Sequence, residues 1–285
     1  MDVSKLLALP LSELRDRFLT RDQAVPEGLL GALESDPRRG AQGLAGQIQR
    51  KKAGNRAEGQ RLRQLLKHER ELWEQGIEHV AGCDEAGIGP LAGPVVAGAV
   101  ILPHDFRPRG IDDSKKLDHA EHEALEAEIK RDAIAWAIGV CSVEEVDRHN
   151  VFRAGLLAMR RAVDGLDVVP GHILVDGKNQ KVPESRIPQR SIIGGDALSI
   201  SIAAASILAK VHRDRLMDAL AKVHPGYGFE THKGYATPEH QAALKSLGAC
   251  PAHRRSFAPV REALGLTPLQ AELFPARPGT ADRAR

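Results

Sequence analysis

The stretch AGCDEAGIGPLAGPVVAGAVIL, residues 81–102, places two adjacent carboxylates, Asp84 and Glu85, inside an apolar segment broken by glycines. The pattern predicts a buried strand, where two charges are costly unless a cation or hydrogen-bond donors compensate them. Side chains on a regular strand alternate between its faces. Because Gly87 and Gly89 permit backbone angles closed to other residues, we expect the strand to end or bulge at Asp84, turning Glu85 toward the same centre.

Other short apolar runs from residue 77 onward indicate an α/β domain. They are GPVVAGAVIL, AIAWAIGVCSV and GHILVDGK, and between them lie the helical patterns HAEHEALEAEIKRD and NVFRAGLLAMRRAVDGL. A longer helix is predicted in SISIAAASILAKVHRDRLMDALAKVH, whose first half is almost entirely small or aliphatic and therefore suited to close packing on a sheet. We predict a mixed sheet flanked by helices.

Two more carboxylates are candidates for the same centre. Asp176 ends the apolar run HILVDGK, and Asp196 precedes the long helix. Functional groups gather at the carboxyl ends of strands in α/β sheets, so we expect Asp84, Glu85 and Asp176 to converge if their strands are neighbours. Oxygen ligands without His or Cys favour Mg²⁺ or Mn²⁺ and are the framework of two-metal phosphodiester hydrolysis. Asp176 in a plain turn and Asp196 as a helix cap remain alternatives.

Composition and the flanking segments define the rest of the chain. We predict a helical extension over residues 1–77, a catalytic domain over 78–262 and a flexible tail over 263–285. Within the extension, residues 57–76 have the spacing of one amphipathic helix. With 40 basic and 38 acidic residues, attraction to nucleic acid must come from uneven placement, such as the basic residues 50–70.

Cysteine usage and hydropathy bear on location. The three cysteines lie far apart and outside any CxxC spacing, which favours a reducing compartment, and we expect a cytoplasmic protein. The longest apolar stretch, residues 91–102, is too short to span a bilayer, so no membrane role is expected.

Six motifs stand in order along the chain and together closely resemble bacterial ribonuclease HII over about residues 78–262. They are DEAGIGPLAGPVVAGAVIL, DDSKKL, ILVDGK, GGDALSISIAAASILAKVHRDR, YGFETHKGYATPEH and HRRSFAPV. The resemblance implies a ribonuclease H-like fold and a metal-dependent endonuclease acting on RNA/DNA hybrids and on DNA duplexes that contain ribonucleotides. Such enzymes cut on the 5′ side of a ribonucleotide and leave 3′-hydroxyl and 5′-phosphate ends, as RNA primer removal and ribonucleotide excision repair require. By motif position, the family's four catalytic acidic residues fall on Asp84, Glu85, Asp176 and Asp196, which would form a two-metal site for Mg²⁺ or Mn²⁺.

The resemblance also implies how the substrate is read. The family recognises the 2′-hydroxyl through a Gly-Arg/Lys-Gly turn and a tyrosine. The turn here is Gly87-Ile88-Gly89, so the cationic side chain is missing, whereas contacts through backbone N–H and C=O groups survive. Tyr235 matches the tyrosine that stacks on the sugar, with a partly buried aromatic as the alternative.

Further contacts and partners follow from the same resemblance. The family's phosphate-side contacts are matched by Ser114, Lys115 and Lys210, although a solvated lysine is the alternative reading for each lysine. The HRRSFAPV motif also includes His253 and Arg254, for which we derive no role from the sequence. The basic helix of the extension would lie along the duplex, unless it is a solvated face. Gln270–Phe274, QAELF, resembles the peptides that bind the sliding clamp. A monomer is expected.

Two other functions compete with this reading. GIGPLA satisfies the G-x-G-x-x-G/A pattern of dinucleotide-binding oxidoreductases. Against it, Pro90 and Pro94 oppose the required helix, and Asp84 and Glu85 would repel a pyrophosphate. A non-catalytic hybrid-binding protein is the second rival, and the presence of all four carboxylates disfavours it.

Overall fold

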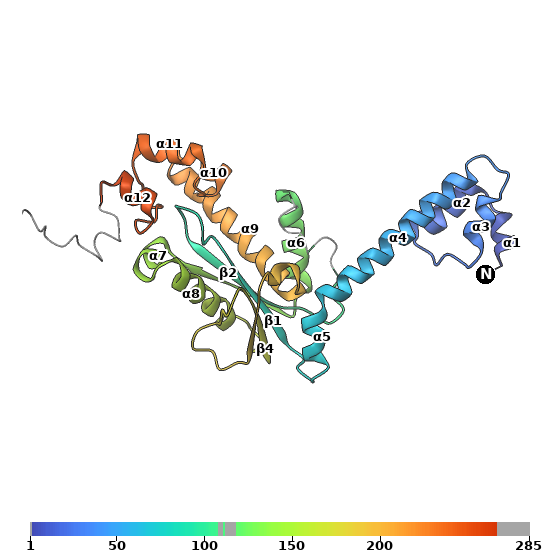
Figure 1. Cartoon of the computed structure of the whole chain (residues 1–285), viewed down its shortest axis with the longest axis horizontal. Helices are drawn as coiled ribbons and strands as arrows, with labels where there is room; N and C mark the ends of the chain where they lie inside the picture. The colour runs from blue at the N-terminus through green and yellow to red at the C-terminus, as the bar shows by residue number, and fades with distance from the viewer. Residues whose placement is uncertain (1, 108–110, 112–117, 267–285) are drawn as a thin grey trace, which may run out of the picture. The chain divides into compact units, whose positions relative to one another are not determined.

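The computed structural model describes residues 2–107, 111 and 118–266 (Figure 1). The chain divides into two compact units, Met1–Gln64 and Leu65–Arg285, and the predicted domain limits at 77 and 262 stay predictions. Among the described residues, no helix is both long enough and apolar enough to cross a membrane.

The first unit is helical. Its elements are α1 (Val3–Leu7), α2 (Leu11–Arg15), a π-helical turn (Asp16–Thr20), α3 (Leu29–Glu34) and α4 (Ala41–Leu65). Buried leucines of the short helices pack with Phe18, Leu44 and Ile48 into a small core. The single amphipathic helix predicted for residues 57–76 is instead two helices, because α4 ends at Leu65 and α5 (Lys67–Trp73) begins after Leu66.

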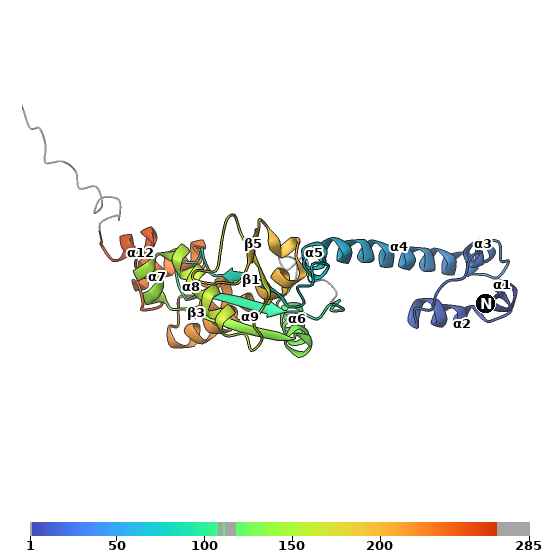
Figure 2. The same ribbon diagram turned by 90° about the horizontal axis from the view of Figure 1, so that it is seen from below.

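The second unit is built on a five-stranded mixed sheet (Figures 1 and 2). Its strands are β1 (Val80–Ala86), β2 (Val95–Ile101), β3 (Ala135–Cys141), β4 (His172–Asp176) and β5 (Gln189–Ile192). The order is β3-β2-β1-β4-β5, with β1, β2 and β3 antiparallel and β1, β4 and β5 parallel. The predicted mixed sheet is confirmed; β5, too short and polar to stand out in the sequence, was not expected.

Helices cover both faces of this sheet (Figure 1). One face carries α6 (His119–Asp132) and α9 (Ile200–Val223), and the other carries α7 (Val143–His149) and α8 (Val151–Asp164). Helices α10 (Phe229–His232), α11 (Pro238–Leu247) and α12 (Ala258–Ala263) follow α9, and a 3₁₀ turn (Gly195–Ala197) precedes it. Alternate residues of β2 face the two cores, because strand side chains point to opposite sides.

Small residues let the long helix approach the sheet. A Cβ at Gly82 of β1 would lie 2.0 Å from the backbone carbon of Ser201, and one at Gly98 of β2 would lie 2.4 Å from the Ala205 oxygen. The same closeness holds on the other face, where a Cβ at Gly139 would lie 2.0 Å from the Ala158 oxygen. The predicted burial of the first half of α9 is confirmed, and its position determines what lies beside the end of β1.

Candidate active site

Strand β1 is regular through both adjacent carboxylates. Asp84 pairs with Gly98 and Glu85 with Ala97, and pairing continues to Ala86. The expectation that the strand ends or bulges at Asp84 is therefore wrong, because β2 pairs with the backbone along the whole segment. Asp84 faces α9, where it hydrogen-bonds the Ser206 side chain, whereas the Cγ of Glu85 faces α8. The two carboxylates reach one site from opposite faces of the sheet.

Strand β4 brings in the third carboxylate. It runs parallel to β1 with Val175 opposite Cys83, so Asp176 ends β4 at the level of Asp84. One Asp176 oxygen accepts a 2.6 Å hydrogen bond from the Gly195 N–H. That bond ties the strand end to the turn that carries the fourth carboxylate, Asp196.

Asp196 does not cap the long helix. The N-cap of α9 is Ser199, whose side chain accepts from the Ile202 N–H, and Asp196 lies in the preceding 3₁₀ turn. The alternative reading of Asp196 as a helix cap is therefore wrong. The buried carboxylate of Glu69 on α5 holds the same helix end, accepting from Ser199 Oγ at 2.5 Å and from the Ser201 N–H at 3.0 Å.

All four carboxylates line one pocket of about 430 Å³. Besides them, it is lined by Ala86, Gly87, Ile88, Gly89, Ser206, Lys210, Arg213, Asp214 and Tyr235. Ser114 and Lys115 lie outside the described residues. Every other residue predicted for the site is thus brought together here.

Two of the carboxylates, Asp84 and Glu85, have raised pKa values. Burial, and then the charges of Glu85 and Asp176, raise the pKa of Asp84 well above its usual value, although the Ser206 hydrogen bond lowers it. Burial and the Asp176 charge raise the pKa of Glu85 to about 7. Crowded acids of this kind are stabilised when a cation neutralises them.

The donor set suits a hard cation. One buried oxygen of Glu85 has no hydrogen-bond partner among the described residues. The acidic ligands offer only oxygen, as Mg²⁺ and Mn²⁺ prefer. No three His, Cys, Asp or Glu side chains in the described ranges already stand close enough to hold an ion. The residues therefore fit a divalent ion in the chemistry of their donor atoms and line one pocket, without forming a ready coordination shell.

The turn Gly87-Ile88-Gly89 forms one wall of the pocket. Gly87 has a φ of +95°, and a Cβ there would lie 2.2 Å from Arg213 Nε, so only glycine fits. The Ile88 side chain packs into the core beneath α8, near Gly155. Isoleucine thus serves as a core residue in this turn, and the backbone is what the turn can offer a substrate.

Tyr235 and Lys210 also line the pocket. The tyrosine is 51% exposed, so the partly buried reading does not apply, and its ring lies near Gly89 and 5.9 Å from the Arg213 guanidinium carbon. Lys210 makes a 2.7 Å ion pair with Asp214 one helical turn along α9. Lys210 is thus exposed and ion-paired, and its reading as a solvated lysine stays open.

Sequence reasoning missed Ser206, Arg213 and Asp214. The signal for Arg213 was present, since it continues the four-residue spacing of Ala205 and Ala209 on the buried side of α9. A charge at such a position needs partners. Arg213 is 2% exposed and donates to the carbonyl oxygens of Ala92, Pro94 and Lys233.

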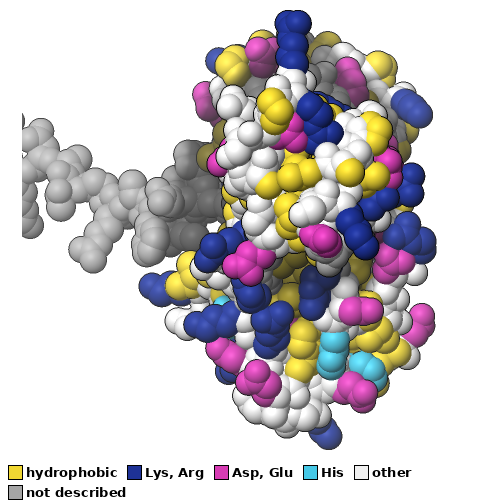
Figure 3. Space-filling model, turned by 90° about the vertical axis from the view of Figure 1, so that its right-hand side faces the viewer, with side chains coloured by type: hydrophobic (Ala, Val, Ile, Leu, Met, Phe, Trp, Pro, Cys, Tyr) yellow, Lys and Arg dark blue, Asp and Glu magenta, His cyan; other side chains and the backbone are white. Residues whose placement is uncertain are grey.

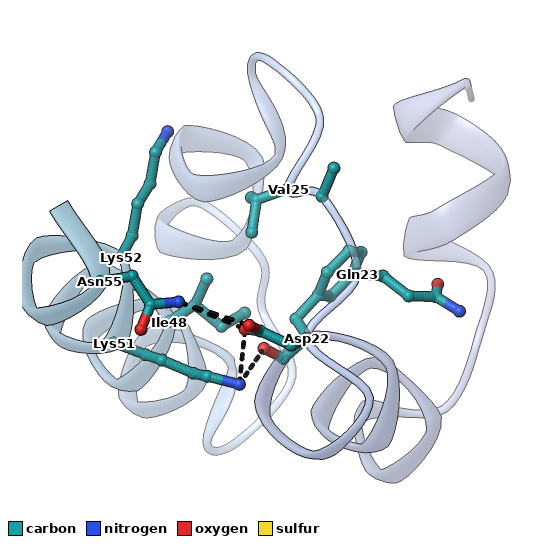
Figure 4. Close-up of a pocket in the computed structure, with 9 residues that line it drawn as sticks. Asp22, Gln23, Val25, Ile48, Lys51, Lys52 and Asn55 are labelled. Atoms are coloured by element: carbon teal, nitrogen blue, oxygen red, sulfur yellow. Dashed lines mark hydrogen bonds and ion pairs between the residues drawn. The ribbon is translucent and has the colours of Figure 1, made fainter. Parts of the chain in front are cut away.

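A hollow in the first unit has a different character (Figure 4). It is lined by residues of the 18–25 segment and of α4, and its one acidic side chain, Asp22, is paired with Lys51 at 2.7 Å. Asn55 donates to the same carboxylate. A single neutralised acid offers no cluster of ligands, unlike the four carboxylates of the pocket at the end of β1.

Comparisons with known proteins identify the family of this chain. The family model for ribonuclease HII matches residues 81–260, and that for the ribonuclease HII N-terminal domain matches residues 11–73. A ribonuclease HII of Myxococcus xanthus (strain DK1622) is 59% identical over 283 residues, covering 97% of this chain and 96% of that protein. One of Geobacillus thermodenitrificans (strain NG80-2) is 51% identical over 234 residues, covering 82% and 89%.

Solved structures show the same fold. The ribonuclease H2 of Pyrococcus horikoshii OT3 matches with a TM-score of 0.57 and 26% identity, covering 65% of this chain and 96% of that one. The ribonuclease HII of Archaeoglobus fulgidus, solved in a complex with PCNA, matches with a TM-score of 0.53 and 28% identity, covering 62% and 93%.

Proposed function

Because this chain belongs to the ribonuclease HII family and is a type 2 ribonuclease H, we propose that the four-carboxylate pocket is its active site. The proposed reaction is Mg²⁺- or Mn²⁺-dependent hydrolysis on the 5′ side of ribonucleotides, in RNA/DNA hybrids and in ribonucleotide-containing DNA. It leaves 3′-hydroxyl and 5′-phosphate ends. The observation that carries the proposal is the convergence of Asp84, Glu85, Asp176 and Asp196 on one pocket, where two of them have raised pKa values.

The four carboxylates would hold the ions. Asp84 is the most buried of them, since it is 6% exposed and lies within a paired strand. The bond from Gly195 orients Asp176. Two bound ions would supply an activated water and stabilise the leaving oxygen. The protein's own contribution is to place acidic oxygens from separate segments on both sides of the scissile phosphate.

The walls of the pocket would select the ribonucleotide. The exposed ring of Tyr235 is free to stack on a sugar, and the backbone of Gly87-Ile88-Gly89 offers polar groups to a 2′-hydroxyl. Lys210, held by Asp214, supports a contact on the phosphate side. The matching roles of Ser114 and Lys115 stay predictions.

Other proposed roles concern the ends of the chain. The PCNA complex of the Archaeoglobus fulgidus relative supports a sliding clamp as partner for Gln270–Phe274, which lies outside the described residues. Figure 3 shows one face of the molecule, on which Lys and Arg are interspersed with acidic and hydrophobic side chains. The basic helix of the extension stays a proposed contact with the duplex. Unchanged hybrid affinity across a salt series after deletion of residues 1–64 would end the duplex-binding role.

The proposal also includes a cytoplasmic location, a monomeric state, and roles in RNA primer removal and ribonucleotide excision repair.

The test is cleavage of a DNA duplex that contains one ribonucleotide. We expect the wild type to cut it with Mg²⁺ or Mn²⁺ and not with EDTA, and Asp84→Asn to lose at least ~100-fold in rate. Asp132→Asn, an exposed aspartate on α6, is the matched control and should cut normally. Equal cleavage by Asp84→Asn, or cleavage in EDTA, would refute the proposal.

A further inference from the structure

The guanidinium of Arg254 lies directly beneath the Gly87-Ile88-Gly89 turn. Arg254 is 0% exposed, and in the part of the chain that the structure describes its bonds go to backbone carbonyls rather than to a carboxylate. The accepting oxygens are those of Gly87 (2.6 Å), Ile88 (3.1 Å), Pro90 (2.7 Å), Gly93 (2.9 Å) and Pro94 (3.2 Å). A buried cation is a poor source of stability compared with an apolar side chain, so its value here is the geometry that it imposes.

Arg254 determines which polar groups the turn presents. In a trans peptide, the N–H lies on the side opposite the preceding C=O, and no described peptide bond is cis. Because the carbonyls of Gly87 and Ile88 point at Arg254, the N–H groups of Ile88 and Gly89 point away from it. The turn therefore offers hydrogen-bond donors on its other side, and these suit a ribose 2′-oxygen.

The preceding residue, His253, reaches the tyrosine through a second histidine. The Cys250 N–H donates to His253 Nδ1 at 3.1 Å, with the Cys250 thiol 3.2 Å from the same nitrogen. A neutral His253 must then carry its hydrogen on Nε2, which lies 3.0 Å from Nε2 of His240. The hydrogen of His240 is thereby placed on Nδ1, which donates to the Tyr235 carbonyl at 2.8 Å. The hydrogen bond from Cys250 to His253 and the hydrogen bond from His240 to Tyr235 therefore agree on one assignment, with the hydrogen on Nε2 of His253 and on Nδ1 of His240.

Other bonds join the turn and the tyrosine into one body. The Arg254 N–H donates to the Leu91 oxygen, and the Leu91 N–H donates to the Gly234 oxygen, both at 2.8 Å. Arg213 spans the same gap by donating to the oxygens of Ala92 and Lys233. The two walls that would read the ribose are thus held by one network, in which adjacent residues of the HRRSF segment each support one wall.

We propose that His253 and Arg254 are the positioning residues of ribonucleotide recognition. Arg254 fixes the Gly87-Ile88-Gly89 turn with its donors outward, and His253, through His240, fixes the backbone of Tyr235. This inference rests on the proposed function, because it assigns the two residues to reading the 2′-hydroxyl and not to hydrolysis.

The test is the ratio of two affinities. Fluorescence anisotropy gives Kd for a duplex with one ribonucleotide and for the matched all-DNA duplex, with Ca²⁺ replacing Mg²⁺ and a gel confirming intact substrate. We expect Arg254→Lys, which cannot span five carbonyls, to lose at least ~10-fold in this ratio, since small displacements of positioned groups have large effects. Its all-DNA affinity should stay within about two-fold. Arg255→Lys, the same change at the exposed next residue, is the control and should keep the wild-type ratio.

The outcomes are distinguishable. A wild type that binds both duplexes equally defeats the proposed function itself. If the wild type prefers the ribonucleotide-containing duplex and Arg254→Lys keeps the same preference, the proposed role of Arg254 is overturned. A fall in both affinities by the same factor indicates a merely structural residue and also overturns it.

The tautomers give a test that does not depend on how a variant folds. In the ¹⁵N-histidine NMR spectrum of the wild-type protein near pH 7.5, we expect His253 with its hydrogen on Nε2 and His240 with its hydrogen on Nδ1. Either ring in the opposite tautomer, or charged, would overturn the connection to Tyr235. Where Arg254→Lys does not fold, His240→Phe takes its place in the affinity test and should show the same selective loss; an unchanged ratio would overturn the role of the histidine pair.

Discussion

Neutralising one active-site carboxylate should make the metal-free protein more stable. The pKa of Glu85 is raised from 4.5 to about 7 by burial and by the Asp176 charge. The unfolded chain therefore loses this proton near pH 4.5 and the folded chain only near pH 7, so stability is lost as pH rises through that window and stays low above it. At 1.36 kcal/mol per pKa unit, the shift corresponds to ~3 kcal/mol.

Glu85→Gln should raise the free energy of unfolding by about that amount at pH 8 in EDTA. At pH 4, where both Glu85 and the glutamine that replaces it are neutral, the substitution should change it by almost nothing. For a unit of this size, the gain corresponds to a rise in Tm of roughly 6–12 °C. Mg²⁺ at 100 times Kd should narrow this difference, because ligand binding stabilises the folded wild type by about 2.7 kcal/mol and the variant by less. Activity should fall even as stability rises.

The matched control is the same substitution at a carboxylate with the opposite shift. Glu145 is ion-paired with Arg161 at 2.6 Å, which lowers its pKa to about 2, so Glu145→Gln should destabilise the protein at pH 8. Urea unfolding monitored by circular dichroism measures both variants. If Glu85→Gln also destabilises the metal-free protein at pH 8, the carboxylates do not repel one another as we argue.

Two further outcomes follow from packing and from the buried histidines. Gly82→Ala should cost at least about 2 kcal/mol in urea unfolding, because its Cβ would lie 2.0 Å from Ser201, whereas Gly54→Ala, in open space on α4, should be neutral or stabilising; equal effects would contradict the close approach of α9. Burial and the neighbouring His240 lower the pKa of His253 from 6.5 to about 4, so unfolding free energy should fall by ~3 kcal/mol as pH drops from 6.5 to 4. A pH profile that does not change when His253 is replaced by Gln would show that this histidine is not held neutral.

Local patterns were sufficient for most of the elements. HAEHEALEAEIKRD is α6 from end to end, and the β-compatible runs became β1 to β4, because period and propensity act over a few neighbouring residues. The strand β5 and the break at Leu66 escaped prediction, since tertiary packing decides short polar strands and helix interruptions.

The sequence by itself determined the chemistry of the pocket: four carboxylates, a glycine turn and a tyrosine, each in a recognisable local setting. Only the tertiary structure decided how they meet. It kept β1 regular, so that Asp84 and Glu85 enter from opposite faces, and it buried Arg254 beneath a turn more than 160 positions earlier in the chain. The physical reason is the sequence distance over which each effect acts. Residue type determines which bonds a side chain can form, whereas its actual partners depend on which distant segments the sheet and its helices bring into contact.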